Sequence, residues 1–220
     1  MKSVSKVSKA MAAILFVPLL FSLVSCVLLY VLLKPTIDLS LSVASMVIAE
    51  NAPDFDADLD SIFQGKDLID RSTVPLSEVV IPYVGVHYAN LSIQRIDLDV
   101  RLYWGDSEKI LRYGAGQYIG SFLPGFQKPL LIGGHNLSVF KQLQYITLDD
   151  EIVIHTNYGE YVYAVDEIVV KKADDPTFYQ LNQEVEQLIL YTCYPFRILS
   201  SRRYDRFVVY GHRISGPDVK

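Results

Sequence analysis

An alternation of apolar and polar side chains over residues 151–170 constrains the fold more than any other feature of the sequence. Two runs, residues 151–156 and 160–170, place apolar side chains at alternate positions, and Asn157-Tyr158-Gly159 separates them. A period of two is typical of a strand with one buried face, and a short connection with glycine is typical of a β-hairpin. The pattern therefore predicts an antiparallel hairpin within a β-rich domain.

Further β-prone runs on both sides of this hairpin extend the β-rich region from residue 79 onward. They are separated by Gly, Asn and Asp, which favour turns. The runs cover residues 79–83, 91–95, 98–103, 129–134, 188–192 and 207–210. Because they are short and joined by turns, the pattern predicts a mainly β domain, built as an antiparallel barrel or sandwich.

Three segments between these runs predict other local structure. Residues 106–112 favour one helical turn, and residues 137–146 favour a short helix because apolar residues stand at 137, 140 and 143. The glycines of residues 114–120 follow the order G-x-G-x-x-x-G without a strand directly before them. We therefore expect a turn-rich loop there and not a dinucleotide-binding loop.

The first 33 residues differ in composition from the rest of the chain. Residues 11–33 form an uncharged apolar run, and Lys2, Lys6 and Lys9 precede it. A helix of this length spans a hydrocarbon core of roughly 30 Å, whereas the apolar core of a cleaved signal peptide is about 7–15 residues. We expect a single-pass membrane anchor, with residues 1–10 in the cytoplasm and the chain after residue 33 outside the cell.

The remaining length allows one folded domain. The chain has 220 residues, of which 50% are hydrophobic, enough for one core and its appendages. Residues 34–77 include an acidic stretch with a proline and are predicted to be a linker, although Phe55, Leu59 and Phe63 could dock on the domain of residues 78–220. The formal net charge of −5 argues against a nucleic-acid partner, which needs a basic surface.

Cys193 has the most distinctive position in the predicted domain. The apolar run of residues 188–192 delivers it to a strand end, directly before Tyr194-Pro195. The second cysteine, Cys26, lies in the proposed membrane span, so the two cannot easily form a disulfide. A free thiol can be a buried apolar residue or a nucleophile, and a nucleophile at neutral pH needs positive charge nearby.

A histidine and an arginine stand at the ends of two other β-prone runs. His135 follows Gly133-Gly134, and Arg206 begins a run that is short and apolar enough to pair with the cysteine strand. An imidazole can accept and return a proton, and a guanidinium group is suited to stabilising an oxyanion. Cys193, His135 and Arg206 are therefore the candidate catalytic residues.

The other histidines and arginines are weaker candidates. The histidines His87, His155 and His212 lie within or after predicted strands, where a surface or half-buried role is favoured. The arginines Arg197, Arg202 and Arg203 lie in the turn and polar loop after the cysteine, where a solvated role is favoured. No pair of His, Cys or acidic residues has the spacing of zinc ligands, so we expect no metal site.

Three runs of the sequence surround the candidate residues: residues 133–136 (Gly-Gly-His-Asn), 189–196 (Ile-Leu-Tyr-Thr-Cys-Tyr-Pro-Phe) and 206–214 (Arg-Phe-Val-Val-Tyr-Gly-His-Arg-Ile). They resemble the signature regions of sortases, the membrane-anchored cysteine transpeptidases of Gram-positive bacteria. The order His, Cys, Arg matches the family, and Thr-Cys-Tyr-Pro-Phe is similar to class D members. Ile189 is a departure, because the family usually has Thr at that position.

The resemblance implies a fold and a reaction. The implied fold is a closed eight-stranded β-barrel with short helices, preceded by a transmembrane helix. The implied reaction cleaves a sorting signal of the Leu-Pro-x-Thr-Gly kind between Thr and Gly, through a thioester on Cys193, and transfers the protein to a cell-wall amine. His135 would protonate the leaving amine and Arg206 would position the substrate or stabilise the oxyanion, and no cofactor is needed.

Alternation along the cysteine strand predicts which residues meet the substrate. Ile189, Tyr191 and Cys193 fall on one face of the strand. We expect Ile189, Tyr191 and the neighbouring Thr192 to line the substrate groove. The departure at Ile189 then affects the peptide preference more than the chemistry.

Two alternative functions stay open at this point. The run of residues 206–214 also resembles class C sortases, which polymerise pilins through a pilin amine, but their Asp-Pro-aromatic lid motif is replaced by Pro53-Asp54-Phe55. The other alternative is a non-enzymatic, membrane-anchored β-domain that binds a partner and keeps Cys193 in its core. Reaction of Cys193 with a thiol reagent at neutral pH would separate this binding domain from the enzymes.

Overall fold

The computed structural model describes residues 16, 19–34, 59–65, 71–175, 177–196 and 204–220. The chain divides into two units, Met1–Asp54 and Phe55–Lys220. In the first unit residues 19–34 are helical, with exposed side chains. They cover part of the predicted span of residues 11–33, of which residues 11–15, 17 and 18 lie outside the described residues. Within the described part of the chain, no helix combines the length and the apolar character needed to cross a membrane.

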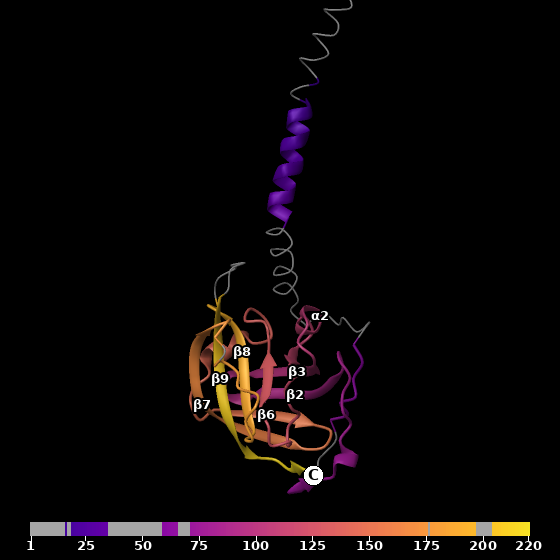
Figure 1. Cartoon of the computed structure of the whole chain (residues 1–220), viewed down its shortest axis with the longest axis vertical. Coiled ribbons are helices and arrows are strands. Elements are labelled where there is room, and N and C mark those ends of the chain that lie inside the picture. Colours follow the sequence, from indigo (N-terminus) through magenta and orange to yellow (C-terminus); the bar gives the residue numbers. More distant parts are fainter. Residues whose placement is uncertain (1–15, 17–18, 35–58, 66–70, 176, 197–203) are drawn as a thin grey trace, which may run out of the picture. The chain divides into compact units, whose positions relative to one another are not determined.

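The second unit contains a closed β-barrel, which eight strands of the described residues form in the order β2-β3-β4-β5-β8-β9-β7-β6 (Figure 1). These strands are β2 (His87–Ile93), β3 (Leu98–Trp104), β4 (Ala115–Gln117), β5 (Leu130–Gly133), β6 (Glu151–Thr156), β7 (Glu160–Lys172), β8 (Gln187–Tyr194) and β9 (Asp205–Ser215). The helical turns are η1 (Leu76–Glu78), η2 (Gln94–Ile96), α2 (Glu108–Leu111) and η3 (Lys141–Tyr145). The closed eight-stranded barrel expected from the resemblance is confirmed.

Strand pairing brings the three predicted functional segments together. The β6–β7 hairpin pairs from Glu151↔Ala164 to His155↔Glu160, as the alternating pattern predicts. β8 lies between two neighbours: it pairs in parallel with β5 and antiparallel with β9. Because β5 leads to His135, β8 carries Cys193 and β9 carries Arg206, the candidate residues come from three adjacent strands.

The two faces of β8 enter different apolar clusters. Leu188 and Leu190 belong to the main core, which fills the barrel with side chains from most of its strands. Ile189 belongs to a smaller cluster with Leu131, Phe178, Val208 and Tyr210, against which Tyr191 packs. Phe178 comes from the connection between β7 and β8, so that connection covers part of the outer face of β8.

Residues 79–83, predicted to be β-prone, do not form a strand. Val80, Ile81 and Tyr83 are exposed, and Pro82 cannot donate a hydrogen bond to a sheet. The backbone forms turns here, with the N–H group of Val86 donating to the Tyr83 carbonyl at 3.2 Å. The apolar composition of this run therefore misled the prediction.

Two further local predictions need correction. The glycine-rich residues 114–120 contain the short strand β4, which pairs with β3 and β5. A side chain at Gly116 would lie 2.4 Å from the Gly105 carbonyl oxygen, so only glycine allows this approach. The helix predicted over residues 137–146 is present only as the 3₁₀ helix η3, with N–H groups bonded three residues back. Its predicted apolar positions 140 and 143 are fully buried.

The barrel unit also includes residues that the sequence assigned to the linker. Phe63 packs against the rings of His87 and His155, with centroid separations of 5.3 and 5.7 Å. Strand β1 (Thr73–Val74) pairs in parallel with β10 (Asp218–Val219). Within the predicted linker of residues 34–77, at least residues 59–65 and 71–77 thus have contacts with the domain, as anticipated for Phe63.

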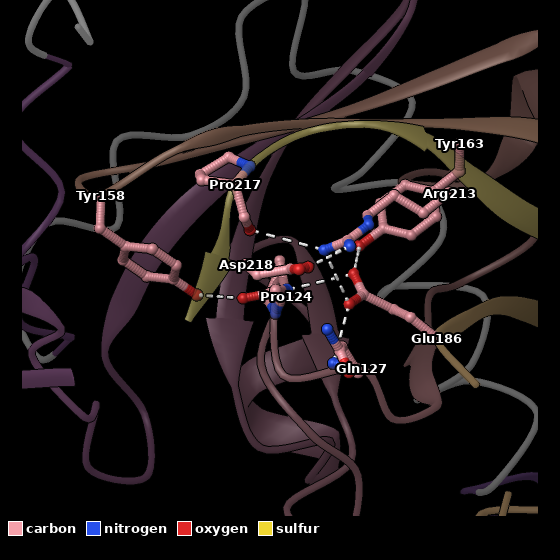
Figure 2. Close-up of polar contacts among 9 residues, drawn as sticks. Pro124, Gln127, Tyr158, Tyr163, Glu186, Arg213, Pro217 and Asp218 are labelled. Carbon is pink, nitrogen blue, oxygen red and sulfur yellow. Dashed lines mark hydrogen bonds and ion pairs between the residues drawn. The ribbon is translucent and has the colours of Figure 1, made fainter. Parts of the chain in front are cut away.

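The buried carboxylate of Glu186 holds the start of β8. At roughly 3.3 Å per residue, this end of the strand is about 20 Å from Cys193. Glu186 is 7% exposed and accepts hydrogen bonds from Gly125 N (3.1 Å), Gln127 N (3.0 Å), the Tyr163 hydroxyl (2.7 Å) and Arg213 (3.1 Å). Figure 2 shows the carboxylates of Glu186 and Asp218 turned toward the Arg213 guanidinium. We call Glu186, these partners and Asp218 the Glu186 cluster; it ties the loop of residues 125–127, β7, β9 and β10 to the start of β8.

Candidate active site

Cys193 and Arg206 lie directly opposite each other in the β8–β9 ladder. Side chains of opposed residues in an antiparallel pair share one face, with Cβ atoms roughly 4.5–5.5 Å apart. Both residues are half-buried, so the thiol and the guanidinium group are partly accessible to solvent. The pairing predicted from the two apolar runs is therefore observed.

Arg206 is held at the start of β9. Its guanidinium group donates to the backbone carbonyl of Asp205 at 3.1 Å. The competing arginines Arg197, Arg202 and Arg203 lie outside the described residues. Among the described arginines, Arg206 is the one that strand pairing sets across from the thiol.

His135 follows the strand β5, which runs parallel to β8. The last paired residues are Gly133 and Tyr191, and the Gly134 N–H group then donates to the Tyr191 carbonyl at 3.3 Å. Two residues further along each segment, the β5 segment reaches His135 and the β8 segment reaches Cys193. The half-buried imidazole thus belongs to the same strand ends as the thiol.

Gly133 and Gly134, directly before His135, allow the histidine segment to lie close to its neighbours. A side chain at Gly133 would lie 2.7 Å from the Tyr191 ring, and one at Gly134 would lie 2.7 Å from the Phe140 ring. Both contacts are closer than real side-chain atoms tolerate, so another residue at Gly133 would displace Tyr191 of β8 and another residue at Gly134 would displace Phe140. The predicted role of Gly133-Gly134 in close packing is therefore observed.

Tyr191 lies two residues before Cys193 on the same face. Burial raises the pKa of Tyr191 to about 12, the negative charge of Asp106 adds to the rise, and the positive charge of Arg206 opposes it. Its phenol is consequently neutral at physiological pH and available as a hydrogen-bond donor. The ring also packs edge-on against Phe178, with centroids 5.4 Å apart.

The predicted groove residues Ile189 and Thr192 are both buried. Ile189 shares the outer face with Tyr191 and Cys193, as alternation predicts, but it has no exposed surface because Phe178 and its neighbours pack over it. Thr192 is 1% exposed, and its hydroxyl donates to the Gly134 carbonyl at 2.7 Å. It therefore supports the histidine loop.

Three residues near the site were missed from the sequence. Asp106 acts electrostatically on Tyr191, although it is 85 residues away in the chain and carries no motif. Phe178 lies in the β7–β8 connection, a largely polar segment in which the other large apolar residues are Tyr179, Leu181 and Val185. Asn136 could have been noticed as the polar neighbour of His135; its side chain donates to the Pro195 carbonyl at 2.9 Å.

The arrangement is suited to acyl transfer. A thiol at a strand end can attack a carbonyl carbon, and an imidazole from the adjacent strand can carry the proton of an amine. A guanidinium group on the opposite strand supplies permanent positive charge where an oxyanion would develop. These three functions need no bound cofactor.

Comparison with known proteins agrees with this geometry. A family model described as the sortase domain matches residues 91–214, which include His135, Cys193 and Arg206. Sortase D of Bacillus subtilis (strain 168) is 28% identical to this chain over 134 residues, or 61% of this chain and 67% of that protein. The similarity to class D inferred from Thr-Cys-Tyr-Pro-Phe is thus supported.

Solved structures share the barrel. A Clostridium perfringens sortase D5 transpeptidase has a TM-score of 0.54 at 23% identity and covers 60% of this chain and 82% of its own, a likeness that shows the fold alone. Sortase C1 from Streptococcus agalactiae has a TM-score of 0.53 at 30% identity, covering 58% of this chain and 67% of its own. Since the sortase-domain match spans more than half of the chain, the protein belongs to the sortase family of cysteine transpeptidases.

Proposed function

We propose that this sortase cleaves a sorting signal of the Leu-Pro-x-Thr-Gly kind between Thr and Gly and transfers the protein to an amine of the cell-wall precursor. One observation carries the proposal: Cys193 is paired with Arg206 across the β8–β9 ladder, at the strand end where β5 leads to His135. This is the set of groups that a thioester mechanism requires.

In the first step, the Cys193 sulfur attacks the carbonyl carbon of the signal's Thr. The carbonyl oxygen becomes an oxyanion, and the Arg206 guanidinium stabilises its charge. Collapse of this intermediate breaks the Thr–Gly bond, and protonated His135 gives its proton to the leaving Gly amine. The product is a thioester between Cys193 and the Thr carbonyl.

In the second step, an acceptor amine attacks the thioester carbonyl carbon. Neutral His135 takes a proton from the attacking nitrogen, and Arg206 stabilises the second oxyanion. The carbon–sulfur bond then breaks, which releases the Cys193 thiolate and leaves a new amide bond. His135 ends the cycle protonated, ready for the next leaving amine.

The proposed location is the outer face of the cell membrane. It is supported by the uncharged run of residues 11–33, of which residues 19–34 are helical, and by the lysines that precede it. In this arrangement residues 1–10 face the cytoplasm, and the barrel meets its protein substrates and the cell-wall amine outside.

Pilin polymerisation is a second candidate function, favoured by the 30% identity to a sortase C1 structure. The chemistry at Cys193, His135 and Arg206 would be the same. The two functions differ only in the acceptor, which is a lysine amine of a pilin in the second case. Competition between a cell-wall-like amine and a pilin lysine peptide would identify the preferred acceptor.

Mass spectrometry of the acyl-enzyme tests the proposed function. A chain of residues 38–220 is incubated with a library of Leu-Pro-x-Thr-Gly-like peptides, without an acceptor amine. We expect an adduct on Cys193 that has the mass of the signal up to Thr, and transfer when an amine is added.

Two variants provide the controls. Cys193→Ala should lose the adduct, the cleavage and the transfer while keeping the circular dichroism of the wild type, whereas Cys26→Ala in the full-length chain should keep full activity. Turnover by Cys193→Ala comparable to wild type would refute the cysteine mechanism. A wild-type thiol that is inert to all peptides and to iodoacetamide would favour a binding domain.

A further inference from the structure

The Asn136 side chain makes a buried contact between the histidine loop and the chain after Cys193. Asn136 is 1% exposed, and its Nδ2 atom donates to the Pro195 carbonyl oxygen at 2.9 Å. A buried polar side chain is costly unless it is hydrogen-bonded, so this partner is a defined part of the fold. The contact joins the residue after His135 to the second residue after Cys193.

A second contact joins the same two segments on the other side of the candidate pair. The Thr192 hydroxyl donates to the Gly134 carbonyl at 2.7 Å. The regular β5–β8 pairing ends at Gly133↔Tyr191, and after the backbone bond from Gly134 N–H to the Tyr191 carbonyl these side-chain contacts continue the connection. The two hydrogen bonds lie immediately before and shortly after His135 and Cys193 in their segments, and they bracket the pair.

We propose that Asn136 is a positioning residue for the reaction, and that its hydrogen bond to Pro195 sets the imidazole of His135 against the thiol of Cys193. The proposal rests on the proposed function of that pair. Asn136 itself does not contact the substrate. It acts by fixing the turn that follows the nucleophile relative to the loop that carries the acid and base.

The amide chemistry of asparagine matters for this role. Its Nδ2 group donates a hydrogen bond at every pH at which the protein is folded, whereas an ionised carboxylate can only accept. An ionised aspartate at this position would place a carboxylate oxygen against the Pro195 carbonyl oxygen. Both groups only accept hydrogen bonds, so the contact would be lost. When protonated, the same aspartate has an O–H group that can donate and restore the contact.

The proposal predicts a specific effect on turnover. Displacing a reacting group by about 1 Å can cost on the order of 10²-fold in rate without a matching loss of substrate binding. We expect Asn136→Ala to lower kcat for peptide transfer by roughly 10- to 100-fold while KM stays within about threefold. Single-turnover formation of the acyl-enzyme should slow by the same factor.

The pH profile distinguishes positioning from general destabilisation. At pH 8, where its carboxyl group is ionised, Asn136→Asp should be as slow as Asn136→Ala. The activity of Asn136→Asp relative to wild type should rise as the pH is lowered from 8 to 5, because burial beside a carbonyl acceptor raises the pKa of the introduced carboxyl group above its ordinary value of about 3.9, and the protonated form regains the donor. The relative activity of Asn136→Ala should stay constant over the same range.

Asn157→Ala is a matched control. The Asn157 side chain also donates to a backbone carbonyl, that of Ile62, but it lies at the β6–β7 turn. Its removal should lower the melting temperature without changing kcat. Asn136→Asp, which keeps the shape of asparagine, is checked by circular dichroism so that the test does not depend on the folding of the alanine variant.

Alkylation of Cys193 by iodoacetamide tests the inference without any peptide. We expect Asn136→Ala to slow alkylation at pH 7 at least threefold relative to wild type and Asn157→Ala. If no peptide is transferred but this difference is seen, the proposed function fails and the positioning contact stands. Equal kcat and alkylation rates in Asn136→Ala and wild type, or a parallel pH profile for Asn136→Asp and Asn136→Ala, would overturn the inference.

Discussion

Arg206 is held by a strand, whereas a charge in a flexible loop would have to be ordered during the reaction. Its position across from Cys193 is set by backbone pairing on both sides of the rung. Removing one preorganised donor to an oxyanion typically costs about 10²- to 10³-fold in turnover. We therefore expect Arg206→Ala to lower the steady-state transfer rate by at least that factor.

Two further variants test whether the effect belongs to this arginine. Arg206→Lys should restore activity only in part, because lysine keeps the charge but lacks the forked array of donors. Arg203→Ala, in the polar run that the sequence predicts to be a solvated loop, should stay within about threefold of wild type, since a solvated charge contributes little. An inactive Arg203→Ala together with an active Arg206→Ala would transfer the role to Arg203.

His87 is a buried histidine outside the candidate site. Its ring lies between Ser61, which contacts Nδ1 at 2.9 Å, and Asn90, which contacts Nε2 at 2.9 Å. Burial lowers the pKa of His87 below its ordinary value, and the positive charge of Arg101 adds to the effect, while the Asn90 hydrogen bond opposes it. The native state therefore favours the neutral imidazole.

Acidification should consequently destabilise the barrel unit through His87. A histidine whose pKa is lowered by folding binds its proton first in the unfolded chain, so stability falls as the pH drops below about 6.5 toward the native pKa. One such proton gives a slope of up to about 1.4 kcal/mol per pH unit. We expect melting curves between pH 8 and 5 to show this loss in wild type and a weaker one in His87→Gln; identical slopes would contradict it.

At the scale of elements, β8 is held at both ends by different means. Its C-terminal end, with Cys193, is bracketed by the contacts of Gly134 and Asn136. Its N-terminal end is held by the Glu186 cluster, in which Arg213 of β9 bridges Glu186 and Asp218. A slip of one residue between β8 and β9 would break these contacts and turn Cys193 to the other face.

Removal of Arg213 should destabilise this arrangement strongly. Breaking a buried ion pair by deleting one partner costs roughly 3–5 kcal/mol, because the remaining charge is left buried. Arg213→Met should show a loss of that order in denaturant-induced unfolding. Arg112→Met is the control: Arg112 pairs with Glu108 on the surface, with side chains 62% and 79% exposed, and its loss should cost less than about 1 kcal/mol.

The same variant should change the response to acid. The hydrogen bond from Arg213 lowers the pKa of Asp218 below its ordinary value. A carboxyl group of this kind stabilises the fold above the ordinary pKa of about 3.9 and loses the contribution as the pH falls through the native pKa. The free energy of unfolding, measured from pH 5 to 2, should therefore fall less steeply in Arg213→Met than in wild type.

At the scale of the whole molecule, the proposed function depends most on the proposed orientation in the membrane. The three lysines before residues 11–33 predict a cytoplasmic N-terminus. Protease added outside intact cells should digest the chain after Lys34 and spare a tag placed before Lys2. Protection of the entire chain would show the opposite orientation.

Local pattern was sufficient for much of this molecule. The β6–β7 hairpin, the strand with Cys193 near its end and the strand with Arg206 near its start follow from alternation and from runs of apolar residues, which act over a few neighbouring residues. The identity of the three candidate catalytic residues also came from the sequence, because His135, Cys193 and Arg206 stand at the ends of such runs. Runs that lack regular spacing were predicted poorly, as residues 79–83 and 114–120 show.

Only the tertiary structure decided which segments lie side by side and which side chains they cover. The parallel pairing of β5 with β8 brings Gly134 to Tyr191 and Thr192, which are 57 and 58 positions later in the chain. The periodicity of one segment does not encode its register with such a distant partner. The burial of Ile189 beneath Phe178, the inward turn of Thr192 and the buried charge of Glu186 likewise depend on packing between distant segments. Sequence determined the faces and ends of the strands, since these are local; tertiary structure decided what each face contacts, since contact depends on the closure of the whole barrel.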